Sequence, residues 1–532
     1  EITQTTITPP SLLSTRTSVT RISAFCLMVS TLGLALLLCV PQLEASGISA
    51  KAASTSTRNL PYISRLRSLR NSHKVPSEKR FVPNRRDLRT HAILETRPAA
   101  TTTEEERGVR QLTYPLDVLV VGGGIGGLTL AKTLKMAGAD VRVTERADLE
   151  TIRLRAAGGP IQLASNALGV LRKIDPDLYE KIQEICTITG LRTNGLKDGK
   201  TGDWYLKFDT KTPASKRQLP PTAVIDRPDL QQLLIDDLEG KVDCGRTMVQ
   251  YQNLPNGKVE VLYSDGSKET ADLVIGADGI WSQVRAQMHM EKRTQGTYSG
   301  FKVFAGICEF TPEDISEVGY KVFMGKKKYF VATDIGRGRI QWYAFIGVPA
   351  EVETPEGQEA LNWLESDIFG EWTDEVRNII GATEVSRVES RSLYDRPPQV
   401  LKGWSDGNVA LVGDAIHPMM PNLGQGGCMA IEDAFVLAEE LAKIDDRSQV
   451  SMALQRYRLR RQVRTAAVQG LSRFGAEMLL RYFDHPFRIE MKDGMPQFIN
   501  FGYFGILMTL WKIFGVLDTT FKLQFNYLFE EP

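Results

Sequence analysis

The chain has 532 residues, enough to bury more than one hydrophobic core, and 42% of them are hydrophobic. The formal net charge of +1 leaves no excess of basic residues, so the composition argues against nucleic-acid binding. The cysteines show no CxxC pair and no metal-ligand spacing, which predicts reduced thiols in a reducing compartment and no metal site.

The N-terminal part is typical of a targeting leader rather than of an enzyme. Arg21 precedes an apolar run over 22–40, so residues 1–45 are expected to be a signal peptide, with an uncleaved membrane anchor as the alternative. Residues 46–112 contain much Ser, Thr and Arg and few acids, which predicts a plastid transit peptide and linker. A signal followed by a transit sequence indicates a plastid enclosed by additional membranes. A disordered basic linker of a secreted protein is the alternative.

A βαβ unit with a glycine-rich turn is expected directly after the leader. The pattern consists of a strand over 117–121, glycines at Gly122, Gly124 and Gly127, a helix over 128–137 and a strand over 141–145. Gly122 permits a tight turn, Gly124 lets the backbone approach a pyrophosphate, and Gly127 lets the helix pack closely on the strand. The helix N-terminus would present free N–H groups to phosphate oxygens. A dinucleotide site is therefore predicted, against the alternative of a glycine turn that binds no nucleotide.

The second strand of this unit ends in Glu145, which Arg146 follows. A carboxylate about 20 residues past the turn accepts hydrogen bonds from ribose hydroxyls and disfavours a 2′-phosphate. We therefore predict FAD or NAD rather than NADP here, with both residues among the cofactor contacts. The glycine motif alone does not separate FAD from NAD.

Two further acids stand at the ends of apolar strands. Asp278 precedes Gly279, and a helix that carries Arg285 follows, which predicts further cofactor contacts. Asp414 follows Gly413, and its carboxylate is expected to hold the ribityl hydroxyls of a flavin, which NAD lacks. A turn or helix-cap role is the alternative for each aspartate.

A glycine-rich loop follows and opens a helix expected over 428–441. Its candidate cofactor contacts are Pro421, Gly424, Gln425, Gly426 and Gly427. A helix N-terminus beside the flavin pyrimidine would stabilise negative charge on the reduced ring. His417 is expected to shape this loop, with proton transfer as the alternative. Cys428 is expected to be a buried packing residue, with a lowered thiol pKa as the alternative.

At these three motifs the chain resembles the single-component, group A flavoprotein monooxygenases of the para-hydroxybenzoate hydroxylase fold, in which the motifs occur in this order. The resemblance covers roughly residues 115–445. Longer strings outside the motifs are similar to the zeaxanthin epoxidase family. These strings span 159–168, 204–210, 276–282, 341–345 and 425–433. This similarity implies that Arg227 is a flavin-contacting arginine, with a surface charge at a helix start as the alternative.

The resemblance implies an enzyme that binds FAD, takes electrons from NADPH, directly or through ferredoxin, and uses O₂ to epoxidise the ring double bond of a xanthophyll of the zeaxanthin, antheraxanthin or diatoxanthin type. It implies a flavin C4a-hydroperoxide as oxidant and no catalytic side chain, because the flavin supplies the chemistry. A carotenoid is comparable in length to the ~30 Å core of a bilayer, so docking on the stromal surface of a thylakoid membrane is expected.

Several alternatives stay open at this point. An aromatic hydroxylase or a prenyl-chain reductase would share the fold, whereas a NAD-dependent dehydrogenase or a non-catalytic membrane scaffold would not need the flavin. Plant members carry a C-terminal FHA domain, which is not expected within the residues up to Pro532, so the resemblance implies the chemistry and not the regulation.

The expected fold class is α/β with α+β character. It comprises a Rossmann-type FAD-binding domain over 113–445, an interleaved antiparallel substrate sheet with insertions at about 190–222 and 296–395, and a helical C-terminal region. Period-two patterns within 296–349 predict this sheet, which would roof an apolar substrate cavity. Candidate lining residues are Phe304, Phe330, Trp342 and Phe345. Ordinary core packing is the alternative for each of them.

Residues 446–532 are expected to be helical, basic at first and apolar from Phe498 to Leu517. Asn500 and Lys512 interrupt the apolar run, so it is a poor spanning helix and suits a helix that lies in the membrane interface. A core helix on the flavin domain is the alternative.

Overall fold

The computed structural model describes residues 108–148, 159–238, 240–294, 296–481, 489–492 and 495–498, with side chains up to residue 476. The expected signal peptide, the transit sequence up to residue 107 and the apolar run beyond Phe498 lie outside these residues. Within the described part, no helix is both long and apolar enough to cross a membrane.

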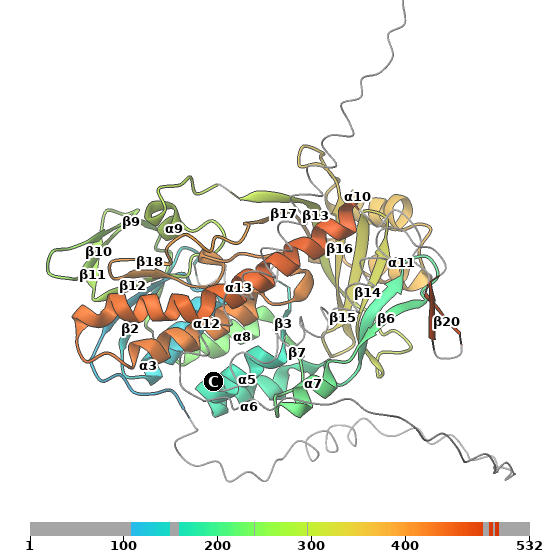
Figure 1. Ribbon diagram of the computed structural model, residues 1–532. Helices are drawn as coiled ribbons and strands as arrows, with labels where there is room; N and C mark the ends of the chain where they lie inside the picture. Colours follow the sequence, from blue (N-terminus) through green and yellow to red (C-terminus); the bar gives the residue numbers. More distant parts are fainter. Residues whose placement is uncertain are drawn as a thin grey trace, which may run out of the picture. The chain divides into compact units, whose positions relative to one another are not determined.

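A six-stranded sheet carries the βαβ unit (Figure 1). Its strands, in spatial order, are β18 (Ser405–Asp406), β19 (Val409–Leu411), β12 (Leu273–Gly276), β1 (Asp117–Val121), β2 (Asp140–Glu145) and β8 (Val242–Cys244). The strands from β19 to β8 run parallel, and β18 pairs antiparallel at the edge. Strand β1 is buried over 118–121, as expected for a parallel sheet that is covered on both faces.

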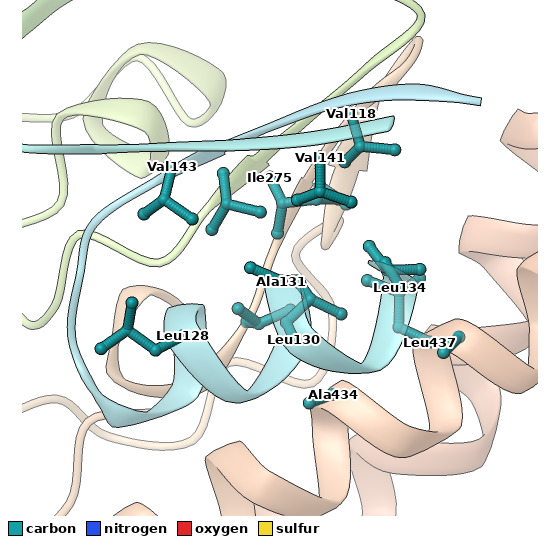
Figure 2. Close-up of a cluster of buried hydrophobic side chains, with 14 of the residues drawn as sticks. Val118, Leu128, Leu130, Ala131, Leu134, Val141, Val143, Ile275, Ala434 and Leu437 are labelled. Carbon is teal, nitrogen blue, oxygen red and sulfur yellow. The ribbon is translucent and has the colours of Figure 1, made fainter. Parts of the chain in front are cut away.

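Helix α3 (Ile125–Met136) lies between this sheet and α12 (Gly426–Leu441), as Figure 2 shows. The packed side chains are Val118, Val141, Val143 and Ile275 from strands, Leu128, Leu130, Ala131 and Leu134 from α3, and Ala434 and Leu437 from α12. Because α3 is covered on two sides, apolar residues occupy most of its circumference. The expected βαβ unit is confirmed, with α3 beginning at Ile125 because the last glycine of the turn is already helical.

A seven-stranded sheet lies apart from the first, at the right in Figure 1. Its strands, in spatial order, are β17 (Val388–Asp395), β13 (Thr297–Glu309), β16 (Arg339–Gly347), β15 (Lys328–Asp334), β14 (Val318–Gly325), β5 (Thr193–Asp198) and β6 (Trp204–Phe208). All neighbours pair antiparallel except β14 with β5. The antiparallel sheet that the period-two pattern predicts is thus confirmed.

This sheet has two faces, because successive residues of a strand point to opposite sides. The face that we call the helix face packs on α10 (Gly357–Trp363) and α11 (Asp374–Gly381). The face that we call the loop face carries Phe301, Val303, Met324, Tyr329 and Phe345, which cluster with Met420 and Ala476. The loop face therefore turns toward the segment that follows Asp414.

The remaining elements connect and cover the two sheets. The smaller sheets consist of β3 (Ile161–Leu163), β7 (Ala223–Ile225) and β4 (Thr187–Ile188), of β9 (Met248–Asn253), β10 (Val259–Tyr263) and β11 (Lys268–Ala271), and of β20 (Ile489–Lys492) with β21 (Met495–Phe498). The remaining helices are α5 (Ser165–Ile174), α6 (Pro176–Ile185), α7 (Lys211–Lys216), α8 (Arg227–Asp236), α9 (Gln283–Met288), the π-helix η4 (Leu364–Ile368) and α13 (Val450–Arg481). Short 3₁₀ helices are η5 (Val385–Arg387), η6 (Gly413–Ala415), η7 (Pro421–Leu423) and η8 (Arg447–Gln449). Helix α13 packs along α12 (Figure 1).

Candidate active site

The glycine turn brings β1, α3 and β12 into close contact. Gly122 adopts φ +118°, and a Cβ there would lie 2.4 Å from the carbonyl oxygen of Ala277. A Cβ at Gly127 would lie 2.1 Å from the carbonyl oxygen of Gly122. A Cβ at Gly124, by contrast, meets no protein atom within 4 Å. Gly122 and Gly127 therefore permit close packing, whereas Gly124 leaves open space at the N-terminus of α3. The free backbone N–H groups at a helix N-terminus are a common binding site for phosphate.

Glu145 is held beside the glycine turn by backbone hydrogen bonds. Its Oε2 accepts from the N–H of Gly123 at 2.8 Å, and its Oε1 accepts from the N–H of Ala147 at 2.9 Å. The side chain is half-buried, so the carboxylate keeps accessible surface next to the turn, and Arg146 beside it is exposed. Glu145 thus lies where the sequence predicts a ribose-binding acid.

Asp278 lies against the same turn. Its Oδ2 accepts from the N–H groups of Gln283 at 2.7 Å and Val284 at 3.3 Å, which caps the start of α9. Its Oδ1 is buried and has no hydrogen-bond partner within the described residues. Burial raises the pKa of the Asp278 carboxyl, and these hydrogen bonds oppose the rise. One oxygen therefore serves the helix cap, and the other remains available to a ligand.

Arg285 joins the Asp-Gly motif to the Gly-Asp motif. Its guanidinium donates to the carbonyl oxygens of Ala415 and Ile280, both at 2.5 Å, and its Nε donates to the Glu291 carboxylate at 3.1 Å. Only 1% of the side chain is exposed, so protein acceptors occupy it. Arg285 therefore positions the backbone beside Asp414, in place of the direct cofactor contact that the motif predicts.

Asp414 and Arg227 lie close enough for their charges to interact, and we call the space beside them the recess. Asp414 follows β19 in η6, and Arg227 is the first residue of α8. Both side chains keep accessible surface. Burial raises the pKa of the Asp414 carboxyl and lowers the pKa of the Arg227 guanidinium. The charge of each residue partly opposes the pKa shift of the other. The accessible surface of both side chains leaves them open to a ligand. Tyr343, on the loop face, also lies near Arg227.

The loop between Asp414 and α12 supplies one wall of this recess. After η7, Gly424 adopts the left-handed conformation with φ +61°, which favours glycine. Gln425 then forms the N-cap of α12 and is buried, with 1% exposed, so its side chain supports the loop from within.

The N-termini of α3 and α12 meet beside this loop. A Cβ at Gly126 would lie 2.8 Å from the Cβ of Ala430, so the two helices approach closely where each begins. A Cβ at Gly426 would lie 3.8 Å from Oδ1 of Asp414. Two positive helix ends and one carboxylate therefore surround the same recess.

These features fit FAD. The open space at Gly124 suits a pyrophosphate, the carboxylate of Glu145 suits a ribose, and the recessed carboxylate of Asp414 suits the ribityl hydroxyls. The N–H groups at the start of α12 suit a ring that becomes anionic on reduction. A cluster of His, Cys, Asp or Glu that could bind a metal ion does not occur in the described part of the chain.

The loop face of the seven-stranded sheet borders the recess through Tyr343 and Met420. Apolar and aromatic side chains on this face are only half-buried and so present accessible surface. They are Leu196, Tyr205, Val322, Val331, Tyr343 and Leu393. An apolar surface beside a polar cofactor recess is the composition of a site for an apolar substrate.

The four expected lining residues divide between the two faces. Phe345 lies on the loop face, stacked on Tyr329 with 4.1 Å between ring centroids. Phe304, Phe330 and Trp342 lie on the helix face, each 0% exposed. For these three the expected cavity position is wrong and core packing holds, because the strand alternation turns them away from Tyr329.

His417 and Cys428 are both buried in the loop region. His417 Nε2 lies 2.6 Å from Oδ2 of Asp433, an anchoring contact that agrees with a loop-shaping role. Cys428 is 0% exposed, and burial raises the pKa of its thiol to about 12. The packing role expected for Cys428 is confirmed, and the alternative of a lowered thiol pKa is wrong.

Residues 115–471 match the family model described as the FAD binding domain. The match spans more than half of the chain, so the protein belongs to this family. Its fold is the mixed α/β fold of the para-hydroxybenzoate hydroxylase type, as the sequence predicts.

Several curated relatives are chloroplastic zeaxanthin epoxidases. The chain is 42% identical to the one from Solanum lycopersicum over 429 residues, which cover 78% of this chain and 62% of the relative. It is 46% identical to the one from Nicotiana plumbaginifolia over 376 residues, which cover 69% of this chain and 56% of the relative. The chain thus spans about three-fifths or less of the length of these two relatives.

Solved structures with this fold include Klebsiella pneumoniae HpxO complexed with FAD and uric acid, with a TM-score of 0.59 and 25% identity, over 68% of this chain and 88% of that one. A salicylate hydroxylase substrate complex has a TM-score of 0.57 and 22% identity, over 69% of this chain and 89% of that one. At that identity the second match shows the fold alone.

The sequence did not predict some of the residues around the recess. Tyr343 belongs to the same strand pattern as Trp342, but only the sheet pairing tells which of the two faces the recess. Asp433 and Arg461 form a buried pair at 2.7 Å that joins α12 to α13. Adjacent acids in a helix that is apolar on either side are the one signal that could have indicated it.

Proposed function

We propose that the protein is an FAD-dependent monooxygenase that epoxidises the ring double bond of a xanthophyll of the zeaxanthin, antheraxanthin or diatoxanthin type. The observation that carries the proposal is the 42–46% identity to relatives named zeaxanthin epoxidase. The half-buried apolar surface of the loop face supports it, because a carotenoid ring needs such a surface beside the flavin.

In the proposed site, the backbone at Gly122 and Gly124 and the N-terminus of α3 bind the pyrophosphate of FAD. Glu145 accepts from the adenosine ribose, and Arg146 covers that end from solvent. The second carboxylate oxygen of Asp278 remains available to the cofactor or to a water beside it. These roles use groups that the protein leaves open at the turn.

At the other end of the cofactor, Asp414 accepts hydrogen bonds from the ribityl chain and Arg227 borders the ring. The loop residues Pro421, Gly424, Gln425, Gly426 and Gly427 shape the pocket for the pyrimidine. The helix dipole of α12 stabilises negative charge there. Bound and reduced, FAD supplies the activation of O₂ and the transfer of one oxygen atom. The protein places the alkene on the loop face and excludes water.

We also propose NADPH as the source of electrons, directly or through ferredoxin. The described residues contain one βαβ unit with a glycine-rich turn, so NADPH would bind only transiently. We propose a plastid location at the stromal surface of the thylakoid, because the substrate resides in lipid and the relatives are chloroplastic. On this proposal the segment 446–532 contributes to membrane association.

The test uses the full chain loaded with FAD, reduced by NADPH with ferredoxin and its reductase, and supplied with vesicles that contain zeaxanthin or diatoxanthin under ¹⁸O₂. The expected product is an epoxide that carries one ¹⁸O atom. β-Carotene vesicles and salicylate serve as comparison substrates.

Three outcomes would contradict the proposal in distinct ways. A purified protein without flavin absorbance would remove the cofactor assignment. Flavin reoxidation by O₂ without epoxide would remove the substrate assignment, and hydroxylated salicylate would favour an aromatic hydroxylase. A saturated carotenoid formed without O₂ would indicate a prenyl-chain reductase.

A further inference from the structure

A cluster of buried charges lies behind the recess, between α12 and α13. Glu432, Asp433 and Arg461 are each 0% exposed, and Arg464 is 2% exposed. Arg461 binds Glu432 at 2.5 Å and Asp433 at 2.7 Å, and Arg464 binds Glu432 at 2.6 Å. Burying an ion pair costs much of its Coulombic gain, so such a cluster is weak evidence for a role in stability alone.

Asp433 connects this cluster to the start of the loop between Asp414 and α12. Its Oδ2 accepts from the backbone N–H of Gly413 at 2.9 Å and lies 2.6 Å from Nε2 of His417. Its Oδ1 accepts from Nε of Arg461 at 2.7 Å. Gly413 adopts φ +58° directly before Asp414, so this hydrogen bond holds the backbone at the residue that precedes Asp414.

Glu432 connects the same cluster to the end of the loop. The Nδ2 of Asn166 donates to Oε1 of Glu432 at 2.7 Å and lies 3.1 Å from Oε1 of Gln425, the N-cap residue of α12. Asp433 therefore contacts the start of the loop directly, and Glu432 reaches its end through Asn166. Arg461 binds both acids.

The charges keep Asp433 in the form that these hydrogen bonds need. Burial raises the pKa of the Asp433 carboxyl, but His417 and Arg461 outweigh burial and hold the pKa at about 2. Asp433 is therefore an acceptor on both oxygens at neutral pH. A neutral amide there could accept on one side only, and its NH₂ group would face the donor of Gly413 or of Arg461.

We propose that Asp433 and Glu432, neutralised by Arg461 and Arg464 of α13, are positioning residues of the FAD site that hold Asp414 and Gln425 in place. The C-terminal helix α13 is then a part of the cofactor site, although its arginines lie behind the loop. This inference concerns FAD binding and does not depend on which substrate is oxidised.

The chain contains a matched control on the same two helices. Glu440, 1% exposed, binds Lys443 at 2.7 Å, Arg456 at 2.9 Å and Arg460 at 2.8 Å. This second cluster also joins α12 to α13 through a buried carboxylate, but Lys443, Arg456 and Arg460 do not belong to the loop. The effects of fastening the two helices and of positioning the loop can therefore be separated.

The experiment compares Asp433→Asn and Glu440→Gln in the full chain. FAD is titrated into each apoprotein by flavin fluorescence, the Tm of each apoprotein is measured, and the flavin absorption bands are recorded. We expect Asp433→Asn to raise the Kd of FAD at least tenfold and to shift the flavin bands. Glu440→Gln should lower the Tm while its Kd stays within twofold of the parent.

The inference is overturned if Asp433→Asn lowers the Tm as Glu440→Gln does but binds FAD within twofold of the parent. Asn166→Leu is the second variant: it removes no charge, so we expect it to fold even if Asp433→Asn does not. It should raise the Kd of FAD at least threefold, and an unchanged Kd in this folded variant would also overturn the assignment. Neither result depends on epoxidation, so the two proposals can fail separately.

Discussion

The guanidinium of Arg285 donates a hydrogen bond of 2.5 Å to the carbonyl oxygen of Ala415. This contact ties the helix after the Asp-Gly motif to the residue that follows Asp414, although the two are far apart in the chain. Because Arg285 is 1% exposed, the contact is shielded from water and its geometry is held by several acceptors.

Arg285→Ala should destabilise the fold and weaken FAD binding together. The substitution leaves buried carbonyl oxygens without a donor and Glu291 without one partner, so we expect a loss of about 3 kcal/mol in the free energy of unfolding. Urea unfolding and FAD titration measure the two effects. Arg377→Ala is the control, because its pair with Asp374 is a surface pair and should cost less than about 1 kcal/mol. Equal stability losses in both variants would contradict this account of Arg285.

Gly124→Ala and Gly127→Ala should separate binding from folding. The new Cβ at position 127 would lie 2.1 Å from the carbonyl oxygen of Gly122, so this variant should lose stability even without FAD. The new Cβ at position 124 meets no protein atom within 4 Å, so the apoprotein should keep its Tm. It would occupy space proposed for the pyrophosphate, and the Kd of FAD should rise tenfold or more. The measurements are the Tm of the apoprotein and FAD titration, and unaltered FAD affinity in Gly124→Ala would place the pyrophosphate elsewhere.

Phe330→Ala and Val331→Ala test the two faces of the seven-stranded sheet with neighbouring residues. Phe330 is 0% exposed on the helix face and stacks on Trp342, so its truncation should cost about 4 kcal/mol of stability. Val331 is half-buried on the loop face, and its truncation should mainly raise the KM for the proposed carotenoid substrate. Urea unfolding and steady-state kinetics of the folded fraction check both effects. A larger change in KM for Phe330→Ala than for Val331→Ala would reverse the assignment of the faces.

Cys428 should resist alkylation in the folded protein across the neutral pH range. Burial raises the pKa of its thiol to about 12 from the ordinary 9.0, so the thiolate fraction at pH 8 falls from about one in ten to about one in ten thousand. The fraction rises tenfold with each pH unit, so labelling should increase steadily toward alkaline pH. Iodoacetamide labelling with peptide mass spectrometry measures it, with urea-unfolded protein as the control. Equal labelling of Cys428 before and after unfolding would show that the thiol is not buried.

Local sequence was sufficient to predict the βαβ unit, because all the residues that define the unit lie within about 30 positions of one another. The glycine spacing, the apolar strands and the acid at position 145 are all read along one short segment, and the antiparallel sheet follows from period-two alternation. The order of Asp278 and Asp414 after this turn was likewise enough to indicate a flavin rather than NAD. The match of residues 115–471 to the FAD binding domain family agrees with this prediction of a flavin.

Tertiary structure alone decided which side chains face the recess and what holds the loop. Alternation places Trp342 and Tyr343 on opposite faces but does not say which face meets the cofactor, since that depends on what packs against each side. The partners of Arg285 and Asp433 come from segments distant in the chain, so local sequence patterns do not predict these contacts. The sequence by itself determined the cofactor class, and long-range packing determined how its site is supported.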